Sequence, residues 1–306
     1  MRFHWYWPFA RDEELAWAHA TARPAESIVV QVIDRPQAPR AGAHGSVEVV
    51  RDLADVGRDV PPWRWAPSRI GTYVGRSRAR RAMWKAGDFD LVHLHYLNRF
   101  TDAADRLPSP VVLSVHDVLP HRSRLGPGER VVLGRLYRRG DALVVHHETL
   151  RAQLILEFGI DPVRVHVVPH QVFLAPDAGG PPPDEPPLIL FFGALRANKG
   201  LSVLLDAAER LRGRDLRFVL AGRGDAEVES IARRAAESDP RIRTEIGFVT
   251  LERKRELFAQ ASLVVLPYTS FSSQSGVLHD AYGHGRPVVV ADGHGGTLLR
   301  EPGSSG

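Results

Sequence analysis

Two cations in one short loop are the residues best suited to chemistry. Arg196 and Lys199 lie in the segment 193–200, Gly-Ala-Leu-Arg-Ala-Asn-Lys-Gly, directly after an apolar run at 188–192. We expect that run to be a strand and a helix to begin at the end of the loop. The loop then lies at the carboxyl end of a strand, where α/β sheets bind ligands. A guanidinium and an ammonium there suit a diphosphate, and ordinary surface charges are the alternative.

A second stretch places small residues at the expected start of a helix. Ser275 and Gly276 follow the apolar run 262–266 and precede a helical pattern. Exposed backbone N–H groups and the positive end of the helix dipole make such a start a site for anions. Asp280 lies about one turn further on, where its carboxylate could accept hydrogen bonds from ribose hydroxyls. The alternative is an ordinary N-cap with an acid on the helix surface.

Strand and helix patterns alternate along the chain. Apolar runs predict strands at 27–33, 91–95, 111–115, 142–146, 165–168, 188–192, 217–221, 242–245, 262–266 and 287–291. Amphipathic runs predict helices at 76–85, 149–158, 200–212, 225–237, 251–260 and 276–283. Such alternation predicts an α/β fold, in which helices cover both faces of parallel sheets.

A proline-rich segment at 175–187 divides this pattern in two. Proline fixes φ and removes a backbone donor, so the segment belongs to neither sheet. We therefore expect two Rossmann-like, doubly wound domains at 1–172 and 187–306, joined by a linker at 173–186. The length of 306 residues fits two domains. The second domain has five predicted strands and no closing helix, so we expect it to be truncated.

Several motifs occur together in a characteristic order. They are GxxxxxKG at 193–200, Ala-Gly-Arg-Gly at 221–224, and SGVLxDAxxxGRPVVxxD at 275–292. Phe-Asp-Leu-Val-His-Leu-His at 89–95, Val-His-Asp-Val-Leu-Pro at 115–120 and Val-Val-Pro-His-Gln-Val-Phe at 167–173 agree with them. From about residue 88 to residue 296, the chain resembles retaining glycosyltransferases of family four, which have the GT-B fold.

This resemblance assigns roles to particular residues. It implies that Arg196 and Lys199 neutralise the diphosphate of a nucleotide sugar as the glycosidic bond breaks, without a metal ion. It implies that His116 lies against the transferred sugar and that Asp280 binds ribose. The substrate-binding residues that it implies are Asp117, Gly193, Gly222, Gly224, Ser272, Ser275, Gly276, Val277 and Asp280.

The sequence departs from the family at three positions. Ser272 stands where the family has a glutamate that touches the donor sugar, and Asp280 stands where it has a second glutamate. The segment Trp7-Pro8-Phe9-Ala10-Arg11 replaces the usual Gly-Gly loop after the first strand. We therefore expect unusual acceptor recognition, and Ser272 leaves the donor sugar and the rate open.

The resemblance implies a transferase that uses a UDP- or GDP-sugar as its donor and needs no cofactor. It would move a hexose, with retention, to a glycan or to a polyprenyl-diphosphate-linked glycan. Two alternatives remain. One is a GT-B nucleotide-sugar epimerase, which would form product without an acceptor. The other is a non-catalytic relative that binds nucleotide, as Ser272 and the short C-terminal end suggest.

A basic segment at 61–85 carries cations and aromatic residues but no acid. It contains Trp63, Arg64, Trp65, Arg69, Tyr73, Arg76, Arg78, Arg80, Arg81, Trp84 and Lys85. We expect contact with an anionic membrane surface or acceptor, and a solvated helix face is the alternative. No nucleic-acid-binding motif accompanies the segment, so we expect no nucleic acid partner.

Composition and histidine spacing limit the remaining possibilities. The chain has no cysteine, no apolar run of the roughly 18–20 residues needed to span a bilayer, and no signal-peptide order at its N-terminus. We therefore expect a cytoplasmic protein, or one peripheral to the inner face of the membrane. His93 and His95 form an HxH pair near His116 and Asp117, but strand residues two apart share a face for packing reasons alone. We expect no metal.

Overall fold

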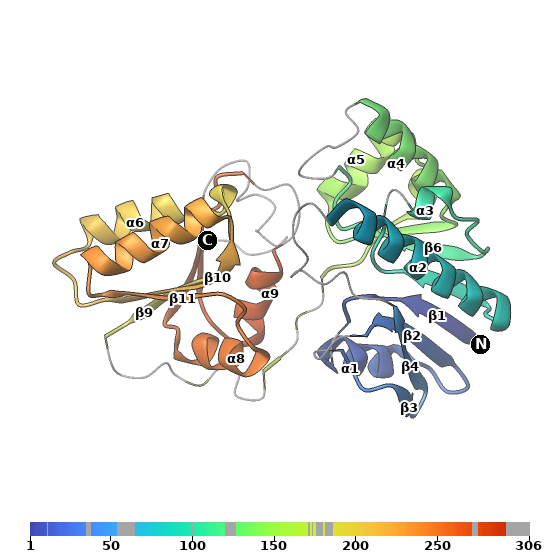
Figure 1. The fold of residues 1–306 in the computed structure, drawn as a ribbon, viewed down its shortest axis with the longest axis horizontal. Helices are drawn as coiled ribbons and strands as arrows, with labels where there is room; N and C mark the ends of the chain where they lie inside the picture. Colours follow the sequence, from blue (N-terminus) through green and yellow to red (C-terminus); the bar gives the residue numbers. More distant parts are fainter. Residues whose placement is uncertain are drawn as a thin grey trace. The chain divides into compact units, whose positions relative to one another are not determined.

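The computed structural model describes residues 1–10, 12–34, 38–53, 65–98, 101–119, 127–170, 172, 174–175, 180, 186–270 and 275–291. The chain divides into two compact units, Met1–Pro169 and His170–Gly306. Each unit is built on its own sheet (Figure 1). Most of the predicted linker at 173–186 lies outside the described residues, as do Ser272 and everything after residue 291.

In the described part of the first unit, eight strands form one sheet in the order β3-β4-β2-β1-β5-β6-β7-β8. They are β1 (Arg2–Tyr6), β2 (Ser27–Ile33), β3 (Gly42–His44), β4 (Val47–Leu53), β5 (Leu91–Leu94), β6 (Val111–Ser114), β7 (Ala142–Val145) and β8 (Val165–Val167). Strand β3 is antiparallel to β4, and all other neighbours are parallel. The order reverses between β1 and β5, and open sheets bind ligands at such a switch point.

Helices cover both faces of this first sheet. They are α1 (Asp12–Thr21), α2 (Trp65–Ala86), α3 (Thr101–Ala104), α4 (Pro127–Arg139), α5 (Glu148–Phe158) and the 3-10 turn η2 (Pro162–Arg164). Trp5 packs with Leu15 of α1, whereas its neighbour Tyr6 packs in the cluster that includes Trp84 of α2. Consecutive strand residues point to opposite faces, so α1 and α2 cover different sides of the sheet.

The second unit repeats the same plan with five strands among its described residues. Their order is β11-β10-β9-β12-β13, all parallel, so the switch point lies between β9 and β12. The strands are β9 (Leu188–Leu195), β10 (Arg217–Gly224), β11 (Ile242–Ile246), β12 (Leu263–Leu266) and β13 (Val288–Val290). The helices are α6 (Leu201–Arg210), α7 (Ala226–Ser238), α8 (Leu251–Gln260) and α9 (Gly276–Gly283), with the 3-10 turn η3 (Ala197–Lys199).

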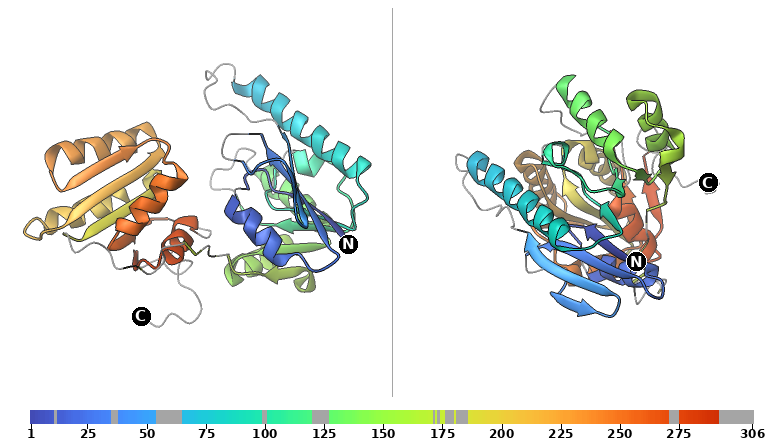
Figure 2. Two further views of the ribbon diagram at one scale, coloured as in Figure 1. Left: turned by 90° about the horizontal axis from the view of Figure 1, so that it is seen from below. Right: turned by 90° about the vertical axis from the view of Figure 1, so that its right-hand side faces the viewer.

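Alternation along β9 separates the two helix layers of this second sheet. Leu190 packs in the cluster that contains Phe258 of α8 and Leu278 of α9. Phe191, the next residue, packs in the cluster of α6 and α7. Helices α6 and α7 therefore cover one face and α8 and α9 the other (Figure 2). Each fully buried aliphatic or aromatic side chain contributes about 1.5–3 kcal/mol to this packing.

The predicted fold class, with two Rossmann-like sheets, is confirmed. Strand β1 was not among the strands predicted from apolar runs, because His4 interrupts its apolar pattern, and only the family resemblance implied a first strand before Trp7. The His4 ring is fully buried, and its Nδ1 accepts a hydrogen bond from Trp84 Nε1 at 3.0 Å. A polar side chain thus occupies a core position with a partner eighty residues away in the sequence. Helix α2 begins at Trp65, well before the predicted start at residue 76.

Candidate functional site

Two loops meet at the switch point of the second unit, one after β9 and one after β12. The amide of Thr269 donates to the Asn198 carbonyl at 3.1 Å, and Asn198 Nδ2 donates to the Ser270 carbonyl at 3.1 Å. Gly200 ends the first of these loops and has a φ of 70°, in the left-handed region. A Cβ at Gly200 would come within 1.7 Å of the Pro267 carbonyl oxygen, so this residue must be glycine. The backbone therefore fixes the loop of Lys199 against the end of β12.

Tyr268 contacts both Lys199, one of the two predicted cations, and Ser275, at the predicted start of helix α9. The Lys199 ammonium lies 3.7 Å from the centre of the Tyr268 ring, and the Tyr268 hydroxyl lies 2.9 Å from Ser275 Oγ. Tyr268 is buried, and burial raises the pKa of its hydroxyl, so the phenol keeps its proton at neutral pH. Lys199 and Ser275 therefore contact the same rigid side chain. The sequence motifs predict both residues as site residues, but they do not reveal the tyrosine that both contact.

The start of α9 has the properties of an anion site. Ser275 is the N-cap residue, and its hydroxyl bonds to Tyr268 instead of capping the helix. The first amides of a helix, here those of Gly276 and Val277, have no acceptor inside the helix. They are the groups that a helix offers to a capping side chain or to an anion. Arg196, in the facing loop, has an exposed side chain.

Asp280 has a partner that the sequence did not reveal. Lys254 of α8 places its Nζ 2.7 Å from Asp280 Oδ1. The lysine side chain is only 10% exposed, and the aspartate side chain is 30% exposed. Because the two residues are 26 positions apart in the sequence, no local spacing pattern predicts the pair.

Gly222 and Gly224, two of the predicted substrate-binding residues, lie where strand β10 passes close to β9. A Cβ at Gly222 would lie 1.8 Å from the Gly193 carbonyl oxygen, and a Cβ at Gly224 would lie 1.9 Å from the Leu195 carbonyl oxygen. Both glycines are thus required where β10 passes β9. Gly193 itself faces α9, since a Cβ there would lie 3.1 Å from Val277 Cγ2.

Aromatic side chains occupy the switch point of the first unit. Phe9 follows β1 and Tyr96 follows β5, and both rings are exposed, at 41% and 37%. They meet edge to face with a centroid distance of 5.1 Å. Behind them the Trp7 and His95 rings stack at 4.2 Å. The segment that replaces the family's Gly-Gly loop thus supplies aromatic surface to this edge.

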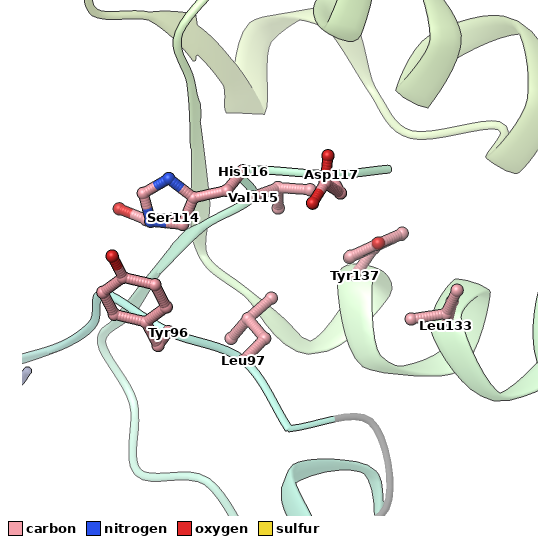
Figure 3. Close-up of a pocket in the computed structure, with 8 residues that line it drawn as sticks. All are labelled: Tyr96, Leu97, Ser114, Val115, His116, Asp117, Leu133 and Tyr137. Atoms are coloured by element: carbon pink, nitrogen blue, oxygen red, sulfur yellow. The ribbon is translucent and has the colours of Figure 1, made fainter. Parts of the chain in front are cut away.

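His116 and Asp117 lie at the end of the next strand, β6, beside a pocket of about 230 Å³ (Figure 3). The His116 ring stacks on Tyr96 at 4.7 Å, and its Nε2 lies 2.8 Å from the His95 carbonyl oxygen. Asp117 lines the same pocket. Figure 3 shows Tyr96 and His116 on one side and Leu133 and Tyr137 of α4 on the other. Polar groups and ring faces therefore share one small pocket.

The neighbouring histidines are held uncharged. Burial, with the nearby His116 and His146 in support, lowers the pKa of His93 to about 3. Burial and the adjacent His93 keep the pKa of His95 well below its usual range. His93 Nε2 lies 2.9 Å from Ser114 Oγ, and the His93 and His95 rings are 3.8 Å apart. Among the described residues, no group of three or more His, Asp or Glu side chains could hold a metal ion.

In the basic segment at 61–85, which was predicted to contact an anionic membrane surface or acceptor, two arginines are buried in the first unit. Arg80 is 1% exposed, and its Nη1 lies 2.8 Å from Asp102 Oδ1, while its Nη2 bonds to Asp105. Ser77 Oγ donates to Asp105 at 2.6 Å, and Arg76 is also buried. These two arginines therefore cannot face a membrane.

Three cations of the same segment do face solvent. Arg78, Arg81 and Lys85 are exposed on α2, whereas residues 61–64 lie outside the described residues. No helix in the described ranges is both long and apolar enough to cross a membrane. Among the side chains that the structure describes in this segment, these three cations are the ones available to a membrane surface.

Solved structures share this arrangement of two sheets. One is Anabaena Alr3699/HepE in complex with UDP and glucose, at 17% identity and a TM-score of 0.64, covering 99% of this chain and 83% of that chain. Another is WaaG, a glycosyltransferase involved in lipopolysaccharide biosynthesis, at 17% identity and a TM-score of 0.62, covering 97% and 83%. The fold of this chain is therefore the GT-B fold of nucleotide-sugar glycosyltransferases.

Each unit of the chain also matches a glycosyltransferase family. Residues 18–175 match Glycosyltransferase Family 4, and residues 186–306 match Glycosyl transferases group 1. This chain therefore belongs to Glycosyltransferase Family 4, and its second unit matches the group 1 glycosyl transferases.

Two curated relatives align over part of their length. The D-inositol 3-phosphate glycosyltransferase of Xylanimonas cellulosilytica is 30% identical over 255 residues, which are 71% of this chain and 58% of that protein. The alpha-D-kanosaminyltransferase of Streptomyces kanamyceticus is 32% identical over 126 residues, which are 40% and 32%. The chain thus covers less than two thirds of either relative.

Proposed function

We propose that this protein transfers a hexose from a nucleoside diphosphate sugar to a hydroxyl of a glycan, with retention and without a metal ion. The observation that carries the proposal is the convergence of Lys199 and Ser275 on Tyr268, at the switch point of the second sheet. A diphosphate there would meet an ammonium and the amino end of α9 together. Both stabilise the negative charge that develops on a departing diphosphate.

The chemistry assigned to each group follows from this placement. The bond between the sugar C1 and the diphosphate oxygen breaks, and a bond from the acceptor oxygen to C1 forms on the same face. The acceptor proton passes to the departing diphosphate. Lys199 and the exposed Arg196 supply the positive charge, and the amides of Gly276 and Val277 hold phosphate oxygens. The solved complexes of a structural neighbour with UDP and with UDP-glucose favour a uridine donor over a guanosine donor.

The acceptor belongs, in this proposal, to the first unit. The pocket beside Tyr96 is smaller than pockets that enclose whole drug-sized ligands, so it suits one ring of a glycan. The face of Tyr96 can pack against the apolar face of a sugar, and Asp117 can accept a hydrogen bond from its hydroxyls. The contact of His116 with the transferred sugar, which the family resemblance implies, is part of this proposal. A lipid-linked glycan would bring its lipid to the exposed cations Arg78, Arg81 and Lys85.

The decisive experiment measures hydrolysis and transfer with a panel of UDP- and GDP-sugars. Replacing Lys199→Ala should lower kcat by roughly 10²–10³-fold, because one preorganised charge on the leaving group is lost. Arg210→Ala, which removes an exposed cation from the last turn of α6, is the matched control and should leave turnover unchanged. Equal turnover in wild type and Lys199→Ala would overturn the leaving-group assignment.

The same panel separates the alternatives. A new nucleotide sugar formed without acceptor would indicate an epimerase. Binding of UDP or GDP by calorimetry, with no turnover on any donor, would indicate a non-catalytic relative.

A further inference from the structure

The ion pair between Lys254 and Asp280 joins two helices on the face of the second sheet that carries the proposed nucleotide site. Lys254 lies three and four positions before Leu257 and Phe258, which are fully buried in the core cluster of this face. Residues at that spacing share a helix face, so Lys254 occupies a core-facing position. Burying an ammonium is costly unless it is paired. The lysine therefore needs Asp280, and its presence calls for a reason other than packing.

The position of Asp280 on α9 supplies that reason. Val277, three residues earlier, faces the end of β9 at Gly193. Asp280 shares that helix face, one turn below the amides proposed to hold phosphate. In a nucleoside diphosphate the ribose follows the phosphates directly. The pair thus lies one helical turn from the amides proposed to hold the diphosphate, at a distance that suits the adjoining ribose.

The hydrogen-bonding capacity of the pair matches two neighbouring hydroxyls. An ionised carboxylate has two oxygens, and an ammonium has three donors. The described contact uses Asp280 Oδ1 and one donor of Lys254. Asp280 Oδ2 and further N–H groups of Lys254 therefore place an acceptor and a donor side by side. Each hydroxyl of a ribose 2′,3′-diol can both donate and accept.

We propose that Lys254 is a ribose-recognising and positioning residue of the nucleotide site. It holds the Asp280 carboxylate in one orientation, and it donates to one hydroxyl of the diol while Asp280 accepts from the other. This inference rests on the proposed function, because it requires a nucleoside diphosphate at the start of α9. It assigns Lys254 to recognition of ribonucleotides over deoxyribonucleotides.

The test compares binding of UDP with binding of 2′-deoxy-UDP and 3′-deoxy-UDP by calorimetry, using the guanosine series if the wild type prefers GDP. The wild type should favour the ribonucleotide. Lys254→Met keeps the length of the side chain and removes its charge. It should weaken UDP binding roughly 10-fold and bind the deoxynucleotides almost as the wild type does, so the preference shrinks. Lys254→Arg should restore part of the preference.

Arg255→Met, which removes an exposed cation from the next position of α8, is the matched control and should change neither affinity nor preference. A Lys254→Met variant that retains the wild-type preference for UDP over its deoxy forms, even with weaker binding of all three, would overturn the inference and leave the proposed function standing. A wild-type protein that binds neither UDP nor GDP would overturn both.

Discussion

The two sheets have the same order around their switch points, but the side chains gathered there differ. In the second unit the switch point holds an ammonium, a hydroxyl pair and the amino end of a helix, at Lys199, Tyr268 and Ser275. In the first unit it holds exposed aromatic rings, at Phe9 and Tyr96, with uncharged histidines behind them. One site suits a diphosphate and the other suits a sugar ring. The strand order fixes where a site forms, and the loops fix what it binds.

The surroundings of one cation in each unit also differ. Arg80 in the first unit is enclosed by Asp102 and Asp105, with its guanidinium 4.7 Å from the Tyr6 ring centre. Lys199 in the second unit lies in a loop at the sheet edge, over the face of a tyrosine. A positive charge surrounded by buried acids stabilises the fold, and one at a sheet edge can meet a ligand.

The largest effect is expected from Arg80→Met, which should lower the free energy of unfolding of the first unit by about 3–5 kcal/mol. Removing one partner leaves the buried carboxylates of Asp102 and Asp105 without their counter-charge. Urea unfolding followed by tryptophan fluorescence measures this change selectively, because all six tryptophans lie between residues 5 and 84. Arg81→Met, at the next position with an exposed side chain, should cost less than about 1 kcal/mol. Equal costs for the two variants would contradict a structural role specific to Arg80.

A smaller effect is expected at the aromatic edge. Tyr96→Ala should raise the acceptor KM about 5- to 10-fold, because the ring face that packs against the acceptor is lost. Hydrolysis of the donor in the absence of acceptor should persist, since Lys199 is untouched. Leu156→Ala, which removes an 83% exposed side chain from α5, serves as the control. A fall in donor hydrolysis that matches the fall in transfer would contradict the assignment of acceptor binding to the first unit and donor chemistry to the second.

The smallest effect concerns pH. Burial lowers the pKa of His4 and His93 to about 3, and that of His95 is also strongly lowered, whereas the unfolded chain has histidine pKa values near 6.5. As pH falls below 6.5, protons bind the unfolded chain first. The stability contributed by neutral histidines is therefore complete above that pH and is lost as pH decreases toward 3.

Each buried histidine should then cost about 1 kcal/mol between pH 7 and pH 5.5. His95→Phe should flatten the pH dependence of urea unfolding by that amount, again followed by tryptophan fluorescence. An unchanged slope in this variant would show that His95 has the same pKa in the folded and unfolded states and would contradict the pKa shift by burial.

Much of the fold follows from local pattern. The apolar runs and helical periodicities predicted β2, α8 and α9 with the bounds that the structure has, and the other predicted strands within a few residues. Strand β1 was missed because tertiary packing places a polar side chain, His4, at a core position and so interrupts the apolar pattern. Strands β3 and β4 form an antiparallel edge pair, which strand–helix alternation does not signal.

The candidate site was only partly predictable, because its key contacts join residues far apart in the sequence. The order of motifs indicated Lys199 and Ser275, but not the tyrosine that links them. Arg80 meets its acids 22 and 25 positions away, so a segment without acids looked like a free basic surface. Lys254 gave no signal in the sequence, since a lysine in an amphipathic helix is ordinary until its buried position is known.

The hydrogen bonds of Asn198 to Thr269 and Ser270, with the close approach of Gly200 to Pro267, have a consequence for protein engineering. They make the two loops of the second switch point a single exchangeable module. A graft that imports one loop from a homologue and retains the other would replace half of a fitted interface. Donor preference should therefore be transplanted by moving both loops as a set. Residues 198, 268 and 275 should covary during evolution, whereas residue 200 should remain glycine.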